Sequence, residues 1–204
     1  MPASAESVAR TRERIHEAAI SLFTRQGFHG TGMRQIAGRA EVSLGNLYNH
    51  HETKRALFGA IIDEFEKRYT AADTPLSKAL ASFRSLDDLE ALGEASRAMV
   101  ERFEDYIRLI YVDVVELQGE HIRRLFGGMR ARYDETLGQR LRDLQEHGRI
   151  GDVDPVSGLM TAMICFFYLF NMERVFGVAS LYGTSDRDAI ATISQLLREG
   201  MSPR

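Results

Sequence analysis

Several features are scarce in this 204-residue chain, and each scarcity excludes a class of structure. The single cysteine, Cys165, excludes a disulfide framework within one chain and is typical of a reducing compartment. The longest apolar run, residues 159–170, is shorter than the roughly 20 residues that a membrane-spanning helix needs. The first 14 residues contain no apolar stretch of the kind found in a signal peptide. We therefore expect a soluble, cytoplasmic protein without a membrane partner.

Excess positive charge is also lacking, because the whole chain carries a net charge of −3. That average conceals an uneven distribution. Residues 1–70 hold 10 Lys/Arg and 8 Asp/Glu, whereas residues 71–204 hold 16 and 21. Residues 10–55 have 8 basic and 4 acidic side chains and four of the six histidines. A basic head followed by an acidic body suggests, without proving, that the head binds an anionic partner.

The apolar spacing at the start of the chain predicts a long helix followed by a short one. Residues 10–26 carry an apolar stripe at helical spacing, and Gly27 follows where a glycine commonly ends a helix. A second helix is expected over about 32–40, with Thr31 or Gly32 as its N-terminal cap. Strand-like alternation is not seen here, so the fold class we expect is all-α.

Two further helices follow at once. Ser43 can cap a third short helix, about 43–50, because its hydroxyl can accept a hydrogen bond from the first amides. A fourth starts near Glu52 or Thr53 and ends near residue 69. Three helices packed under a fourth, with a short turn between the second and third, form a helix-turn-helix unit.

The rest of the chain is predicted to be helical as well. Pro75 marks a boundary, so we expect a flexible arm (1–9), a helix-turn-helix domain (10–70) and a helical second domain (75–204). Helical spacing continues over residues 87–118, 120–147, 155–176 and 186–200. The first of these is expected to divide near Glu104, and the second is weakened at Gly127–Gly128, where two glycines cost roughly 1–2 kcal/mol of helix propensity.

The third helix is short and polar, with little surface to bury, and its outer side chains suit DNA. Asn46, Tyr48, Asn49 and His50 can all face outward; asparagine can pair with adenine in the major groove, and hydroxyls suit phosphate oxygens. Gly45 leaves the start of the helix open to a phosphate. Lys54 could add a charge against phosphate. Arg10, Arg12 and Arg14 could follow the DNA backbone or enter the minor groove.

Residues 12–37 and 42–58 resemble the DNA-binding domain of the TetR family of bacterial transcriptional regulators. The matching positions are Arg34, Ile36, Ala37, Val42, Ser43, Gly45, Leu47, Tyr48 and Lys54. The resemblance implies that Leu47 lies in the core, that Tyr48 and Lys54 lie near phosphate, and that Leu44, Asn46, Asn49 and His50 face the groove. The expected DNA-binding set is Thr31, Arg34, Ser43, Leu44, Gly45, Asn46, Tyr48, Asn49, His50 and Lys54.

Four positions depart from the family pattern. Glu41 stands where the turn usually has glycine, and a left-handed backbone there would cost roughly 1 kcal/mol. Gly32 replaces a usual Ser or Thr and removes one hydroxyl from the phosphate side. His51 occupies a position usually filled by Phe, which suggests a buried, hydrogen-bonded histidine. Arg55 replaces a common Glu and adds positive charge near the DNA.

The second domain is expected to sense a ligand and to dimerise. The resemblance implies a homodimer formed by helices 155–176 and 186–200, a palindromic operator, and a repressor released by a small effector. Met and aromatic side chains favour a hydrophobic or amphipathic effector. Its expected lining is Tyr106, Leu109, Ile110, Asp113, Phe126, Met129, Tyr133, Met163, Phe167 and Asn171. Such residues at helical spacing also suit an ordinary core.

An enzyme is the competing class, and the motifs it needs are lacking. Residues 27–32 resemble a phosphate loop only superficially, since the preceding strand and the Walker spacing are absent. A carboxylate metal site needs two Glu-x-x-His motifs, whereas only Glu13 and His16 form one. We therefore expect no catalytic residue, metal or cofactor. A helical ligand- or partner-binding protein whose head no longer binds DNA is the alternative left open.

Overall fold

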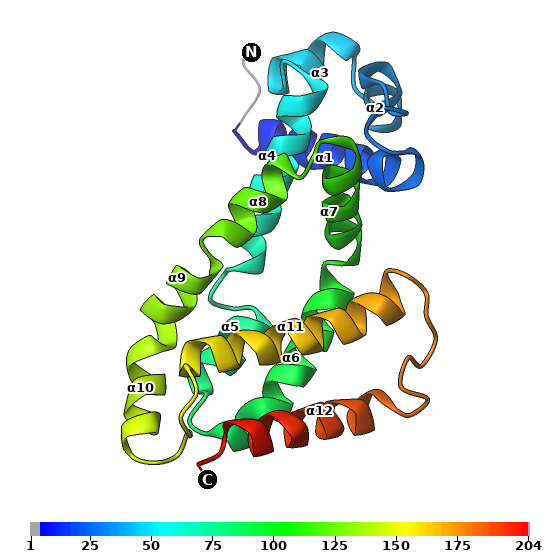
Figure 1. Cartoon of the computed structure of the whole chain (residues 1–204). Coiled ribbons are helices and arrows are strands. Elements are labelled where there is room, and N and C mark those ends of the chain that lie inside the picture. The colour runs from blue at the N-terminus through cyan, green and yellow to red at the C-terminus, as the bar shows by residue number, and fades with distance from the viewer. Residues whose placement is uncertain (1–4, 204) are drawn as a thin grey trace. The chain divides into compact units, whose positions relative to one another are not determined.

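The computed structural model describes residues 5–203, and its regular structure there is helical throughout (Figure 1). The α-helices are α1 (Ala5–Gln26), α2 (Met33–Arg39), α3 (Leu44–His50), α4 (Lys54–Tyr69), α5 (Pro75–Ser82), α6 (Leu89–Arg102), α7 (Glu104–Glu116), α8 (Glu120–Gly127), α9 (Met129–Tyr133), α10 (Gln139–Glu146), α11 (Pro155–Arg174) and α12 (Asp186–Met201). A 3₁₀ turn, η1 (Leu86–Asp88), and a π-helical turn, η2 (Asp134–Gly138), complete the set. The all-α prediction is confirmed.

The helix boundaries follow the sequence closely, with one extension. α1 begins at Ala5, so residues 5–9, which were expected in a flexible arm, are helical; residues 1–4 of that arm lie outside the described residues. Helix α5 was not predicted from the sequence. Both α4 and α5 begin with a threonine cap, because the hydroxyls of Thr53 and Thr74 accept backbone N–H groups of the first turn. The chain divides between α6 and α7 at Phe103, and between α8 and α9 at Gly128.

The chain forms two compact units. Unit 1 contains the described residues up to Arg68 together with Asp105–Arg124, and unit 2 contains Tyr69–Glu104 and the residues from Leu125 onward. The sequence had placed residues 105–124 in the second domain, whereas in the structure they complete the core of the first unit. That core buries side chains from α1, α2, α3, α4 and α7, and its members include Ile15, Phe23, Ile36, Leu47, Phe58 and Leu109.

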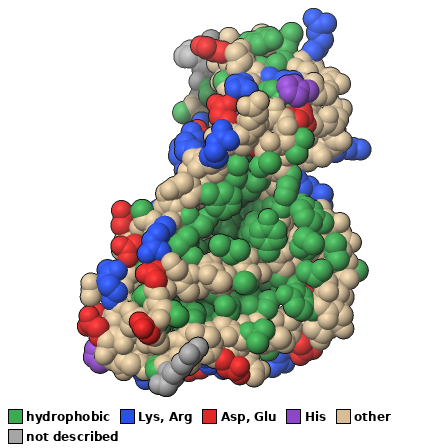
Figure 2. Space-filling view, in the orientation of Figure 1, with side chains coloured by type: hydrophobic (Ala, Val, Ile, Leu, Met, Phe, Trp, Pro, Cys, Tyr) green, Lys and Arg blue, Asp and Glu red, His purple; other side chains and the backbone are tan. Residues whose placement is uncertain are grey.

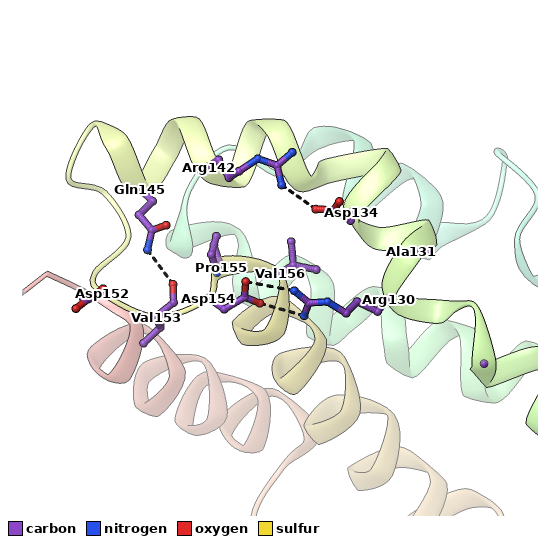
Figure 3. Close-up of a pocket in the computed structure, with 11 residues that line it drawn as sticks. Arg130, Ala131, Asp134, Arg142, Gln145, Asp152, Val153, Asp154, Pro155 and Val156 are labelled. Atoms are coloured by element: carbon purple, nitrogen blue, oxygen red, sulfur yellow. Dashed lines mark hydrogen bonds and ion pairs between the residues drawn. The ribbon is translucent and has the colours of Figure 1, made fainter.

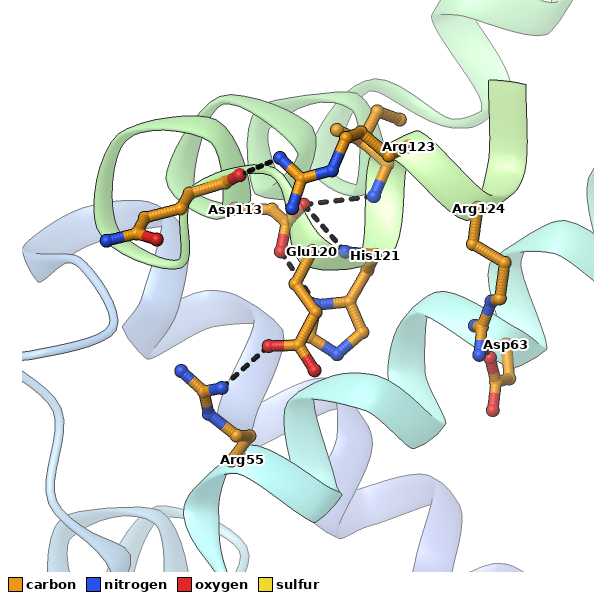
Figure 4. Close-up of polar contacts among 9 residues, drawn as sticks. Arg55, Asp63, Asp113, Glu120, His121, Arg123 and Arg124 are labelled. Atoms are coloured by element: carbon orange, nitrogen blue, oxygen red, sulfur yellow. Dashed lines mark hydrogen bonds and ion pairs between the residues drawn. The ribbon is translucent and has the colours of Figure 1, made fainter. Parts of the chain in front are cut away.

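A corner between α7 and α8 closes unit 1, and the carboxylate of Asp113 organises it (Figure 4). Asp113 Oδ2 accepts the backbone N–H groups of His121 and Ile122 at 3.1 and 3.0 Å. Its Oδ1 lies 2.7 Å from the ring Nδ1 of His121, and that ring packs against Phe58 with centroids 5.4 Å apart. Asp113 is thus a buried N-terminal cap for α8.

The same helix α7 also holds the turn that leads from α1 to α2. Glu116, in the last turn of α7, accepts the backbone N–H groups of Phe28 and His29 at 3.1 and 2.6 Å. Gly27 begins this turn with φ +79°, a left-handed conformation that glycine adopts without steric cost. A Cβ at Gly27 would also lie only 2.2 Å from Glu116 Oε1, so any other residue would displace the carboxylate that accepts these N–H groups.

Unit 2 is built around α11. This helix packs against α6, α12, α9 and α10, and α6 in turn contacts α5 and α12. Gly93 on α6 permits the close approach, because a Cβ there would lie 2.7 Å from Ile190 on α12 and 3.0 Å from Phe166 on α11. The sequence Asp154–Pro155 starts α11, with the Asp154 carboxylate accepting the Ser157 N–H at 2.7 Å and proline in the first turn.

By length and composition, α11 is apolar enough to cross a membrane, with a mean hydropathy of 1.5. Half of that stretch is buried inside unit 2, where Leu159, Phe166 and Phe170 are almost fully covered. A core helix has the same composition, and the packing of α11 between α6 and α12 accounts for its apolar side chains.

Replacing Gly27 by alanine is expected to destabilise unit 1. The substitution forces a left-handed alanine, which costs about 1–2 kcal/mol, and it displaces the Glu116 carboxylate. Gly38→Ala is the matched control, since its Cβ meets no atom within 4 Å and a helical alanine gains about 0.5–1 kcal/mol over glycine. Thermal unfolding of both variants measures this; equal midpoints would contradict the role of Gly27.

Candidate nucleic-acid interface

Helix α3 is held at both ends and by one buried side chain. At its start, Ser43 Oγ accepts the N–H of Asn46 at 3.1 Å. At its end, the N–H of His51 donates to the Leu47 carbonyl at 2.9 Å. Leu47 is fully buried, as the family resemblance implied. Only two turns long, the helix therefore depends on its neighbours for its position rather than on its own propensity.

The outer face of α3 is polar and open. Gly45, Asn46 and Asn49 are exposed, and Tyr48 keeps 46% of its surface accessible. A Cβ placed at Gly45 would meet no atom within 4 Å, so the start of the helix is uncovered. His50 is partly buried, and Leu44 packs against the core rather than pointing fully outward. Amide, hydroxyl and bare backbone donors on one small face suit the edges of bases and phosphate oxygens.

A depression of about 430 Å³ lies between the starts of α2 and α3. Its lining is Thr31, Gly32, Met33, Arg34, Leu44, Tyr48 and Lys54. Gly32 is the N-terminal cap residue of α2, and its N–H donates to the side-chain oxygen of Gln35 at 2.8 Å. Five residues of the expected DNA-binding set thus meet at one place on unit 1.

Two members of that set have structural partners. Thr31 is buried, and its hydroxyl donates to the Gly27 carbonyl at 2.7 Å. Lys54 Nζ donates to the carbonyls of Phe28 and Thr31, each at 2.6 Å, and lies 4.4 Å from the centre of the Phe28 ring. Burial lowers the pKa of Lys54 below its ordinary value, and the nearby Glu116 opposes that change. Its charge holds the α1–α2 turn in this structure.

The arginines near the head also have partners within unit 1. Arg14 donates to the carbonyls of Ala40 and Glu41, the latter at 2.8 Å. Glu41 has φ +53°, so the left-handed turn expected there is present and Arg14 covers its carbonyls. Arg55 pairs with Glu120 at 2.6 Å (Figure 4). Arg10 pairs with Glu6 at 3.2 Å. Arg34 remains exposed on α2.

Sequence reasoning missed several of these contacts. Arg14 was a candidate for contact with the DNA backbone or the minor groove, and Arg55 for positive charge near DNA; in the structure each bonds to a protein oxygen. The partners lie 26 to 88 positions apart along the chain, so no local spacing indicates them. His51, by contrast, is buried and hydrogen-bonded as the sequence suggested.

The residues expected to line an effector cavity are divided between the two units. Tyr106, Leu109, Ile110 and Asp113 belong to unit 1, whereas Phe126, Met129, Tyr133, Met163, Phe167 and Asn171 belong to unit 2. Leu109 lies in the core under the helix-turn-helix, and Asp113 is occupied as the cap of α8. Tyr106 stacks on Phe65 at 5.3 Å and accepts a hydrogen bond from Arg68. In unit 2, Met163 and Asn171 are buried and Phe126 is half exposed.

Unit 2 has a pocket of about 900 Å³ at the start of α11 (Figure 3). Its lining is Gly127, Arg130, Ala131, Asp134, Arg142, Gln145, Asp152, Val153, Asp154, Pro155 and Val156, and it includes none of the expected effector residues. Arg130 bonds to Asp154 at 3.1 Å, and Arg142 bonds to Asp134 at 2.8 Å. These charges are exposed and already paired, so this polar pocket is a different site from the expected apolar cavity.

The helix-turn-helix with an open, polar third helix defines a DNA-binding regulator, and comparisons with known proteins agree. Residues 15–61 match the family of bacterial regulatory proteins called the tetR family. The transcriptional repressor Rv3405c of Mycobacterium tuberculosis is 32% identical over 142 residues, 69% of each chain. The regulator UidR of Escherichia coli is 25% identical over 193 residues, covering 92% of this chain and 89% of UidR. The chain belongs to the TetR family of transcriptional regulators. Its relatives are regulators and not enzymes.

Solved structures support the same fold. The regulator SCO4942 of Streptomyces coelicolor has a TM-score of 0.66 at 19% identity and covers 95% of this chain and 99% of its own. AibR, solved with isovaleryl coenzyme A and operator DNA, also has a TM-score of 0.66 at 19% identity, covering 91% of this chain and 97% of AibR. Because these identities are low, the likeness concerns the fold.

Lys54→Met is expected to destabilise unit 1, because it keeps the aliphatic stem but removes both charge-assisted hydrogen bonds to the α1–α2 turn. Leaving the two buried carbonyls unpaired costs about 1–3 kcal/mol. Arg55→Met, one residue along, removes only an exposed ion pair and should cost at most about 1 kcal/mol. Denaturant unfolding of the two variants compares them. A smaller loss for Lys54→Met than for Arg55→Met would contradict this role for Lys54.

Proposed function

We propose that this protein is a homodimeric repressor that binds a palindromic operator and is released by a hydrophobic or amphipathic effector. The observation that carries the proposal is the open face of α3, where Asn46, Tyr48 and Asn49 are exposed beside an uncovered helix start. Asparagine side chains can bond adenine with two hydrogen bonds, and the tyrosine hydroxyl suits a phosphate. Membership of a family of transcriptional regulators, with the repressor Rv3405c among its relatives, supports this use.

Dimerisation through α11 and α12 is supported by what these helices leave uncovered. Ile164 and Tyr168 on α11 are 52% and 54% exposed, and Leu196 on α12 is 64% exposed. Figure 2 shows hydrophobic side chains gathered on the face of unit 2 where these helices lie. A contiguous apolar surface of this kind is typical of a protein interface. Two copies joined there would present two α3 helices to half-sites about 34 Å apart.

Release by an effector requires that ligand binding favour one arrangement of the two α3 helices, the proposed recognition helices, over another. Three helices pass from one unit to the other along the chain, since α4 ends at Tyr69, α7 begins at Glu104 and α8 ends at Gly127, all in unit 2. A coupling of about 1–3 kcal/mol through them would weaken operator binding 5- to 150-fold. AibR, which shares the fold, was solved with an acyl coenzyme A, and that supports an amphipathic effector here.

Selection from a random pool of DNA duplexes tests operator binding. We expect a palindromic product whose affinity falls steeply with salt, because lysine and arginine contacts release counterions. Asn49→Ala should then relax the preference at one base pair by about 1–3 kcal/mol, whereas Tyr48→Phe should weaken all duplexes alike. No enrichment from folded protein would refute DNA binding by α3, and unchanged affinity and base preference in both variants would refute these residue roles.

Dimerisation is tested by placing charge on the exposed apolar surface. Leu196→Glu combined with Tyr168→Glu should shift the protein to a monomer in sedimentation velocity, because carboxylates cannot be buried unpaired at an interface. Val115→Glu is the matched control, since Val115 on α7 is 79% exposed and lies outside α11 and α12. If the double variant stays dimeric, or if Val115→Glu is equally disruptive, the interface lies elsewhere.

A further inference from the structure

Two histidines meet inside unit 1, and DNA contact by α3 does not account for them. His16 on α1 and His51 after α3 are 5% and 8% exposed. Their Nε2 atoms lie 3.2 Å apart, and their ring centres are 5.1 Å apart. His51 fills the position that carries phenylalanine in the family pattern, so a polar pair has replaced an apolar contact. Because the backbone N–H of His51 caps α3, the ring of the same residue is tied to the recognition helix.

The contact between the two Nε2 atoms is a hydrogen bond only when one of them carries a proton. His16 Nδ1 lies 2.7 Å from the Glu64 carboxylate on α4, which can only accept a hydrogen bond when ionised. His16 therefore carries its proton on Nδ1 when neutral, and its Nε2 has a free lone pair. His51 then donates from Nε2. The order Glu64–His16–His51 links α4, α1 and the end of α3 in one buried chain of hydrogen bonds.

Charges near the pair come from three helices. Glu64 on α4 attracts a proton to His16, whereas Arg12 on α1 and His50 on α3 oppose protonation. Arg68 lies 3.7 Å from the second oxygen of Glu64 and reduces its attraction. Burial is the largest effect and lowers the pKa of both histidines, that of His51 to about 4. Both rings are therefore neutral at pH 7, and the hydrogen bond is intact.

Acid disrupts this arrangement in two stages. A first proton can bind to Nε2 of His16 if His51 moves its own proton to Nδ1. The hydrogen bond then runs in the opposite direction, from His16 Nε2–H to His51 Nε2. A second proton leaves two N–H groups facing each other, with two positive charges in a buried site. We propose that the His16–His51 hydrogen bond positions the recognition helix and that acidification, by breaking this bond, weakens operator binding. This inference rests on the proposed operator binding by α3.

The direction of the pH effect follows from proton uptake. The ordinary histidine pKa is about 6.5, whereas burial lowers the pKa of His51 to about 4. A head in which the two histidines have separated therefore binds protons that the intact head excludes as pH falls from about 6.5 toward 4. The intact head is favoured above this range and loses stability within it. We expect operator affinity to fall between pH 7.5 and 5.5, by up to about tenfold for one such histidine. His50 is partly exposed on α3 and belongs to the expected DNA-binding set, so its contribution is tested by a variant of its own.

The test measures operator affinity of the full chain from pH 7.5 to 5.5 at constant ionic strength, with EDTA so that no metal bridges the imidazoles. The probe is the duplex obtained by selection. His51→Gln keeps a donor to His16 but cannot titrate, so it should bind as wild type does at pH 7.5 and lose most of the pH dependence. The double variant His16→Leu with His51→Phe should behave similarly through apolar packing. His50→Asn should retain the full loss.

The possible results distinguish failure of the proposed pH effect from failure of the proposed operator binding. Parallel pH profiles for wild type and either histidine-pair variant would overturn the inference. An operator affinity of His50→Asn that stays flat or rises on acidification would also overturn it. Circular dichroism at each pH confirms that the compared proteins are folded, and if the double variant is unfolded the glutamine variant still decides. Failure of every protein, wild type included, to bind DNA at pH 7.5 would instead refute the proposed function.

Discussion

The turn between α1 and α2 is held by two opposite charges, and the position of α2 beside α3 depends on it. Glu116 accepts the amides of Phe28 and His29, while Lys54 donates to the carbonyls of Phe28 and Thr31. The two side chains come from α7 and α4, so both of these helices are tied to the six-residue turn 27–32 that joins α1 to α2. Because an unpaired backbone group in a covered site costs about 1–3 kcal/mol, this turn has one strongly preferred conformation. The left-handed Gly27 makes that conformation possible.

The functional surface of unit 1 is formed by the groups that this framework leaves open. Arg14, Lys54, Arg55 and Asp113 all bond to protein partners, whereas Asn46, Asn49 and Tyr48 on α3 remain exposed. Phosphate contacts fix the register of a protein on DNA and base contacts give it specificity. In this head several positive charges bond to protein oxygens, whereas the polar groups of α3 are exposed, as are Arg12 and Arg34.

The helices themselves were largely predictable. Ser43 caps α3, Pro155 begins α11, and the chain breaks at Phe103 and Gly128, each close to the position that spacing indicated. Apolar periodicity and caps act within one or two turns, and therefore the sequence contains them directly. The π-helical turn η2 was not foreseen, since it depends on an extra residue rather than on a change of pattern. The effector residues could not be separated from core residues by the same periodicity.

By itself, the sequence determined the all-α class, the order of the helices, the helix-turn-helix and its family, because these depend on local spacing and on a dense motif. Only the tertiary structure decided which polar side chains are available. Arg14 and Glu41, Phe28 and Glu116, and His16 and His51 are far apart in the chain, and a charged or imidazole group carries no local mark of its partner. It also placed residues 105–124 with the head, since burial of Leu109 and Leu117 depends on a surface that four other helices create.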